Sequence, residues 1–373
     1  MMTRRGRLLR SRRLSLLLPA LAVAACGPGD VPADVVLLGG PVVTLAEEGI
    51  VEGIAIRGNR VAAIGAEREI RAFIGPETRV VELHGRSVIP GLTDNHLHSI
   101  GGGPGVDLSK VRSMDELLDA IAERAAQTPA GEVIVTNSDW HEGQLVEQRL
   151  PYRDDLDRAA PSPPLVVVRG GHADFVNSAG LREWAVTRTT PDVPGGRIGR
   201  YADGRLHGEL VDRAKDYVRL PAGPTPDRDA RKDALAEQYA VLNSRGLTSV
   251  RHPGSTIEQY ELISELEEEG RLDMRLDVRF RAPSAGGRDE VLAAHALWPD
   301  PPATGTGYEE RMLRIDGVKL GVDGGFEGGL MREPYDEPWG EQGTFFGLQT
   351  MRTEAFEDAV RLLRNDGWRV ATP

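Results

Sequence analysis

The pattern of hydrophobic and polar positions divides the chain into three parts. Between residues 33 and 90, short runs of β-branched residues are bounded by glycines. These runs cover residues 33–38, 53–57, 60–64 and 79–83. Gly58-Asn59 suits a hairpin turn between the second run and the third. The pattern predicts a small β-sandwich unit over residues 33–90.

Residues 110–170 show helix and strand signals in turn. Ser113-Met114-Asp115-Glu116 is a capping-box sequence, which predicts an amphipathic helix reaching about Ala126. The apolar runs at 132–136 and 165–168 suit buried strands.

From residue 227 onward, helix and strand signals alternate strictly. The predicted helices cover residues 227–245, 257–269, 289–297 and 353–365, and the predicted strands cover 247–250, 274–280, 315–322 and 368–371. Such alternation favours a parallel sheet with helices outside it, so the chain is predicted to be an α/β protein. A doubly wound sheet and a barrel both fit this order.

The first 25 residues have the three-part pattern of an export signal. A basic segment, Arg4–Arg13, precedes the apolar segment Leu14–Val23, and small residues follow. Cys26, the only cysteine, follows Val23-Ala24-Ala25, which resembles a bacterial lipobox. We expect a signal peptide over 1–25, lipidation of Cys26, a tether over 26–32, and a location in the bacterial periplasm or cell envelope. An ordinary signal peptide with an incidental cysteine is the alternative.

Charge and composition narrow the class of protein. The formal net charge is −12, and loss of the six arginines in residues 1–25 would make it −18. So acidic a chain argues against nucleic-acid binding. No later segment approaches the ~20 apolar residues of a membrane span, so we expect membrane contact through the lipid anchor alone. The sequence does not predict an oligomeric state.

Two histidines one residue apart form the most informative motif. In the stretch Val88–His98, Pro90-Gly91 marks a turn after an apolar start. If the stretch is a strand, Asp94, His96 and His98 point the same way. Two imidazoles separated by about 6.6 Å of rise can converge on one metal ion. Asp94 can orient one of them. A pair of surface histidines is the alternative.

The stretch Val88–His98 resembles the signature of the amidohydrolase superfamily. Further motifs resemble amidohydrolase family 3, which includes N-substituted formamide deformylases. They are Ser138-Asp139-Trp140-His141, Arg169-Gly170-Gly171-His172, Val176-Asn177-Ser178, Gly195-Gly196-Arg197-Ile198, Gly246–Val250, and Val318-Lys319-Leu320 with Asp323-Gly324. The resemblance implies a (β/α)8 TIM-type metal-dependent hydrolase barrel with an N-terminal β-sandwich. We expect about the first five barrel strands within residues 91–373, with a large insert at about 99–245.

Lys319 is one of only four lysines and lies in a predicted strand. A buried ammonium is costly unless it is paired or its pKa falls, and a lysine with a lowered pKa can react with CO2 to form a carbamate. The resemblance implies this role, a carboxylated lysine that bridges two metals. His96, His98 and Lys319 are therefore the expected ligands of one or two divalent metals, with zinc the expected ion. An ion pair with Asp316 or Asp323 is the alternative for Lys319.

Four residues are candidates for substrate binding. His172 follows two glycines at a strand end, where the backbone can approach a ligand closely. Trp140 and His141 could line the same pocket, and Asp323 is predicted as a pocket residue. The role of His252 stays open, because the family usually has an acid there. The remaining histidines, His84, His207 and His295, are predicted to be structural or surface groups.

The resemblance implies hydrolysis of a small-molecule amide or formamide, at a carbon–nitrogen bond other than a peptide bond, by attack of a metal-bound hydroxide. It also implies a later His-x-x-Gly-Asp motif, a second histidine and a proton-shuttling aspartate, and none occurs up to Pro373. The catalytic residue is therefore not identified. The sequence is expected to be the N-terminal part of a hydrolase or a truncated remnant. A non-catalytic lipoprotein that binds a solute or metal is the alternative.

Overall fold

The computed structural model describes residues 31–98, 105–220, 226–283, 288–300, 311–325, 328–336 and 342–372. The chain divides into two compact units, residues 1–90 and 91–373. The predicted signal peptide and Cys26 lie outside the described residues and stay predictions. Within the described ranges, no helix combines the length and the hydropathy needed to span a membrane.

The first unit is built on a four-stranded sheet in the order β5-β4-β1-β6. Its elements are β1 (Val35–Leu38), β2 (Val42–Val43), β3 (Ile50–Val51), β4 (Gly53–Arg57), β5 (Arg60–Gly65), α1 (Glu67–Ile70), a 3-10 helix (Arg71–Phe73) and β6 (Arg79–Glu82). The predicted turn is present, with Gly58 at φ +58° between antiparallel β4 and β5. Strands β2 and β3 form a separate two-stranded sheet. A sandwich therefore stays a prediction, and the unit also carries the short helices that the strand pattern did not predict.

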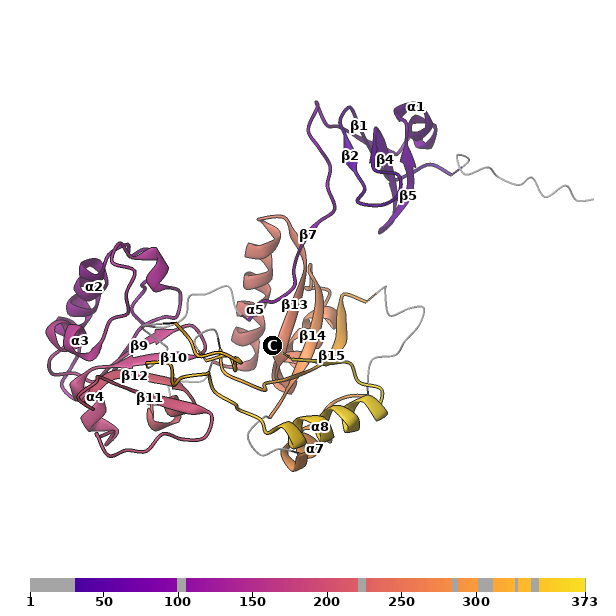
Figure 1. Ribbon diagram of the computed structural model, residues 1–373. Helices are drawn as coiled ribbons and strands as arrows, with labels where there is room; N and C mark the ends of the chain where they lie inside the picture. Colours follow the sequence, from indigo (N-terminus) through magenta and orange to yellow (C-terminus); the bar gives the residue numbers. More distant parts are fainter. Residues whose placement is uncertain are drawn as a thin grey trace, which may run out of the picture. The chain divides into compact units, whose positions relative to one another are not determined.

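The second unit contains a five-stranded sheet, β16-β15-β14-β13-β7, in which every neighbouring pair is parallel. Its strands are β7 (Leu92–Asp94), β13 (Leu247–Ser255), β14 (Arg275–Ala282), β15 (Leu313–Leu320) and β16 (Val370–Ala371), and its helices are α5 (Arg228–Asn243), α6 (Ile257–Glu268), α7 (Arg288–His295) and α8 (Thr353–Asn365). The prediction of alternating helices and parallel strands is confirmed. Figure 1 shows β13, β14 and β15 side by side, with α5 next to β13.

This half-barrel sheet has one apolar face and one charged face. Alternate residues of β14 are buried, from Leu276 to Ala282, and the residues between them are Arg or Asp. The apolar face packs against the helices. Its contacts include Tyr239 of α5, Ile263 of α6, Val291 of α7 and Leu363 of α8. The charged side chains therefore point to the opposite face, which would be the interior of a closed barrel.

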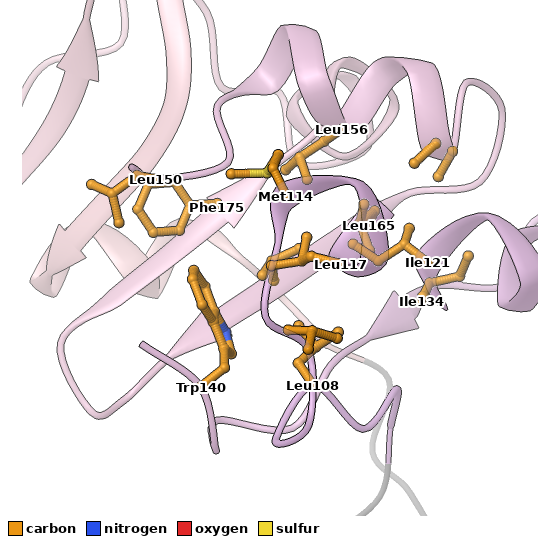
Figure 2. Packing of buried hydrophobic residues seen from close by; sticks show 14 of the residues in the cluster. Leu108, Met114, Leu117, Ile121, Ile134, Trp140, Leu150, Leu156, Leu165 and Phe175 are labelled. Atoms are coloured by element: carbon orange, nitrogen blue, oxygen red, sulfur yellow. The ribbon is translucent and has the colours of Figure 1, made fainter. Parts of the chain in front are cut away.

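A second sheet, β11-β12-β10-β9-β8, is inserted between β7 and β13. Its elements are α2 (Met114–Gln127), β8 (Ile134–Val135), a 3-10 helix (Glu142–Gln144), α3 (Arg153–Ala159), β9 (Leu165–Arg169), β10 (Ala173–Val176), α4 (Ser178–Glu183), β11 (Gly196–Arg200), β12 (Leu206–Asp212) and a 3-10 helix (Arg213–Tyr217). Figure 2 shows the core formed by α2, α3 and the sheet, with Leu117, Leu156 and Phe175 packed together. A second apolar cluster contains Val176 and Leu210. Phe175 and Val176, neighbours on β10, thus pack into different apolar clusters, which explains why every residue of this strand is buried.

The predicted helix start at Ser113 is confirmed. Ser113 Oγ accepts a hydrogen bond from the Glu116 backbone N–H at 3.2 Å. The Glu116 carboxylate does not return the bond to Ser113 but accepts one from the Arg112 backbone N–H at 2.6 Å. The helix therefore begins at the predicted residue with a shifted form of the box.

Candidate metal centre

The two histidines of the His-x-His motif converge at the carboxyl end of β7. The strand ends at Asp94, so the prediction of an extended strand through His98 is wrong. The backbone turns instead, and the Nε2 atoms of His96 and His98 lie 3.2 Å apart. Two nitrogens bound tetrahedrally to one zinc ion at 2.0–2.1 Å would be about 3.3 Å apart. The spacing therefore suits two ligands of a single ion.

Neighbouring groups hold this turn in place. Asp94 Oδ1 accepts a hydrogen bond from the His96 backbone N–H at 2.9 Å, and the Leu97 N–H donates to the Arg251 carbonyl at 3.0 Å. His252 on β13 is 3% exposed, and its Nε2 lies 3.4 Å from the Tyr239 hydroxyl. Burial lowers the pKa of His252, against the opposing effect of a hydrogen bond to the Leu97 backbone. His252 thus stabilises the turn that carries His96 and His98 through its contact with the Leu97 backbone.

Lys319 lies near the carboxyl end of β15, half-buried, beside Arg281 of β14. Its pKa is lowered by burial first, and then by the positive charges of Arg281 and Arg279. The alternative of an ion pair is not realised. Asp316 is engaged by Arg279 at 2.5 Å and also by two other arginines, and Asp323 accepts from the Leu330 N–H at 3.0 Å. Among the residues that the structure describes, no carboxylate pairs with Lys319.

The electrostatics of the site favour neutral imidazoles. The pKa of His98 is lowered to about 4, mainly by burial and then by the charge of Lys319. Burial and Lys319 also lower the pKa of His96, although Asp94 opposes them. Both rings therefore offer nitrogen lone pairs at neutral pH, the form that binds a metal.

The described side chains do not supply a complete set of metal ligands. No cluster of three or more His, Cys, Asp or Glu side chains suits a metal ion within the described ranges. The two histidines fit one ion by their spacing, and a carboxylated Lys319 would add an oxygen ligand. With Lys319 carboxylated, the site fits a metal ion.

The structure places His172 beside Asp212 and beside the segment that follows Asp323. His172 Nδ1 lies 2.6 Å from Asp212 Oδ1. A Cβ built on Gly325 would lie 2.2 Å from His172 Cγ, so the backbone two residues after Asp323 passes directly over this ring. Asp212 is not predicted from the sequence, because no motif marks the end of its strand.

The other two predicted substrate residues have different places. Trp140 is 4% exposed in the core of the inserted unit, and its indole N–H donates to the Val168 carbonyl at 2.8 Å. This burial contradicts its predicted position in a pocket lining. His141 Nδ1 accepts from the Gly143 N–H at 2.9 Å, where it caps a 3-10 helix, and its Nε2 lies 2.9 Å from the Arg169 guanidinium. His141 therefore has a structural role in the local turn.

The remaining histidines lie in varied settings. His84 is exposed. His207 packs on the Tyr152 ring, and its pKa is lowered to about 4 by burial first and then by Arg197. His295 Nε2 accepts from the Trp368 indole at 3.1 Å. His207 and His295 thus have the packing contacts of structural residues.

Comparison with known proteins gives consistent matches. The sequence model of the amidohydrolase family matches residues 79–373. The Bacillus subtilis protein YtcJ is 30% identical over 346 residues, which cover 89% of this chain and 62% of YtcJ. The N-substituted formamide deformylase of Arthrobacter pascens is 29% identical over 240 residues, which cover 62% of this chain and 44% of that enzyme. The chain thus spans less than two thirds of either relative.

Solved structures show the same fold. An uncharacterized metal-dependent hydrolase from Pyrococcus furiosus aligns with a TM-score of 0.55 at 24% identity, covering 91% of this chain and 66% of that one. A second, from Pyrococcus horikoshii, aligns with a TM-score of 0.56 at 20% identity, covering 91% and 64%. At these identities the alignments report on the fold alone.

Proposed function

Because the chain belongs to the amidohydrolase family, we propose that it is part of a metal-dependent hydrolase. The reaction is cleavage of an amide or formamide carbon–nitrogen bond other than a peptide bond. The observation that carries this proposal is the 3.2 Å approach of the His96 and His98 Nε2 atoms at the end of β7. The resemblance to an enzyme named N-substituted formamide deformylase supports the choice of bond.

His96, His98 and Lys319 would hold one or two divalent ions, for which zinc is the proposed metal. A bound ion would polarise the substrate carbonyl and lower the pKa of a water molecule to about 7. All three residues lie at or just beyond the carboxyl ends of parallel strands, where barrel enzymes place their active sites.

Burial and the neighbouring positive charges favour carboxylation of Lys319. The free amine is the form that attacks CO2, forming a carbamate with loss of one proton. The lowered pKa of Lys319 raises the fraction of free amine. Arg281, its neighbour on β14, stands beside it to balance the resulting negative charge.

His172 and Asp323 are proposed to border the substrate. Asp323 fixes its own turn through the Leu330 N–H, and Gly325 passes over the His172 ring. This arrangement connects the end of β15, which carries Lys319, to the inserted unit.

We propose export and lipidation at Cys26 on the strength of the N-terminal pattern. Mass spectrometry of the N-terminal peptide from the membrane fraction tests this directly. A diacylglyceryl-modified Cys26 is the expected result, and an unmodified Cys26 in a soluble fraction would contradict it.

The experiment for the hydrolase is turnover of a substrate panel by the full-length protein. The panel contains N-alkylformamides, N-acyl amines and a dipeptide, each tested with added Zn²⁺ and after chelation. We expect turnover of the first two classes alone, lost on chelation and restored by metal. Tight metal binding without turnover would instead support a non-catalytic binding protein.

A further inference from the structure

The pair His172–Asp212 lies where two strands of the inserted sheet end. His172 immediately precedes β10, and Asp212 is the last residue of β12, which pairs with β10. The Asp212 backbone N–H donates to the His172 carbonyl at 2.7 Å, and the side chains meet at 2.6 Å. The His172 side chain is 47% exposed and that of Asp212 only 12%. The carboxylate is therefore enclosed while the ring keeps an open side.

Asp212 has an unfavourable backbone conformation. Its φ is +48° and its ψ is −118°, a region that suits glycine and is costly for other residues. Strain of this kind persists where the surrounding structure imposes it, and it is concentrated at functional sites. The conformation directs the Asp212 carboxylate to the His172 ring.

One oxygen of the same carboxylate has no hydrogen bond. Asp212 Oδ2 is buried and has no partner among the described residues. A carboxylate that served only the fold would be expected to use both oxygens. Among the described residues, the contact with His172 is therefore the hydrogen bond that the Asp212 carboxylate makes.

Glycines from the segment after β15 approach the pair closely. A Cβ on Gly324 would lie 2.9 Å from Asp212 Oδ2, and one on Gly325 would collide with the His172 ring. Gly324 is five positions after Lys319 in the chain, a reach of at most about 18 Å. The pair therefore lies within a short chain length of the strand end that carries Lys319.

A carboxylate oxygen only accepts hydrogen bonds, so the contact with Asp212 requires the proton of the His172 ring on Nδ1. In a neutral ring Nε2 then carries the lone pair, and 47% of the His172 side chain is exposed. We propose that Asp212 fixes this tautomer, so that His172 Nε2 accepts a hydrogen bond from the N–H of a secondary amide or formamide substrate. The inference rests on the proposed function and adds a substrate class to it. Asp212 is a positioning residue, and His172 is the residue that contacts substrate.

The kinetic test compares N-butylformamide with N-butyl-N-methylformamide, which lacks the N–H. A site that accepts this hydrogen favours the first compound by about a hundredfold or more in kcat/KM. His172→Phe and Asp212→Gly are expected to reduce this preference by at least tenfold. Asp216→Ala, at a 72% exposed side chain in the adjacent 3-10 helix, is the matched control and leaves the preference unchanged. An equal loss for both substrates in the variants would overturn the proposal.

Asp212→Gly also separates function from folding. Glycine adopts the conformation at this position without strain, so the variant is expected to have a Tm no lower than that of the parent. Loss of the N–H preference at an unchanged Tm supports the proposal. Retention of the full preference contradicts it.

A second readout does not depend on turnover. In the full-length protein with ¹⁵N-labelled histidine, we expect the His172 ring to carry its proton on Nδ1, and on Nε2 in Asp212→Gly. N-Butylformamide is expected to shift the Nε2 resonance, and the N-methyl compound is not. If the protein shows this pattern without turnover, the hydrolase assignment fails and the binding role of His172 stands. An Nε2–H tautomer in the parent, or no shift with either compound, would overturn the inference.

Discussion

The half-barrel sheet and the inserted sheet each have five strands, but their polar residues are distributed differently. The half-barrel sheet keeps one face for charged residues, which pair with one another. Arg251 and Arg279 engage Asp316, and Arg314 engages Asp277. The inserted sheet is mostly apolar on both sides. Its buried charges form local pairs, Arg169 with Glu142 and Arg197 with Glu209. Asn177, just after β10, is bonded to the backbone of Leu165 and Ala160.

Because of this difference, the residues that indicate a functional site are of a different kind in each sheet. On the charged face, the informative residue is Lys319, a half-buried amine that pairs with no carboxylate among the described residues and has a lowered pKa. In the inserted sheet, the informative residues are Asp174, whose pKa burial raises, and Asp212 at its edge, with its unfavourable backbone conformation.

The largest expected effect comes from removing a proposed ligand. His98→Ala is expected to lower kcat/KM by at least about a thousandfold, since metal ions contribute several kcal/mol to such reactions. Metal content measured on the same sample should fall in parallel. His84→Asn, at an exposed histidine of the first unit, is the control and should change neither quantity. Full activity in His98→Ala would show that the metal site does not lie at the half-barrel sheet.

Breaking the charged network should cost the most stability. Asp316→Asn leaves three arginines without their shared partner, at a residue that is 8% exposed. We expect the free energy of unfolding to fall by about 3–5 kcal/mol in urea denaturation. Asp358→Asn, which breaks an exposed i,i+3 pair with Arg361, should cost less than about 0.5 kcal/mol. Equal effects of the two variants would show that the ion pairs of the charged face stabilise the fold no more than exposed surface pairs do.

Substitution of Asp174 is expected to raise the free energy of unfolding, unlike substitution of Asp316. Burial raises its pKa to about 6, with Lys215 opposing, so the folded protein resists its ionisation. The unfolded chain ionises near pH 4, and stability is therefore lost as pH rises from about 4 to 6. Asp174→Asn should raise the free energy of unfolding by about 2 kcal/mol at pH 8 and by little at pH 4. A gain that is the same at both pH values would contradict this account.

The smallest expected effect lies at the start of α2. Ser113→Ala removes the hydrogen bond to the Glu116 N–H and should cost about 1 kcal/mol of unfolding free energy. Ser162→Ala, at an exposed position, is the matched control and should be neutral. A neutral Ser113→Ala would show that the Glu116–Arg112 contact alone is enough to begin the helix.

The sequence predicts the half-barrel sheet well, because each of its helices and strands has its own periodicity and glycine stops. The extents of two strands are exceptions. β7 ends at Asp94, before the two histidines, and the strand predicted over 247–250 continues as β13 to Ser255. A register shift between Pro253 and Ser255, with Gly254 at φ +106°, accommodates the proline within the sheet.

The inserted sheet is less predictable from sequence. The strands β10, β11 and β12 have no clean alternation, because residues on both sides are buried. Trp140 is predicted to line a pocket, but its side chain fills the core of the inserted unit. Asp212 could not be found, because its role depends on a backbone conformation that no local pattern encodes.

The central claim is that His96, His98 and a carboxylated Lys319 form a metal centre. The most direct test is the metal content of the full-length protein, purified with Zn²⁺ and bicarbonate, in the parent, Lys319→Met and Lys110→Met. Lys110 is exposed and supplies the matched control. The account predicts one or two equivalents of metal in the parent and in Lys110→Met, and the loss of at least half in Lys319→Met. Parental metal content in Lys319→Met would contradict it.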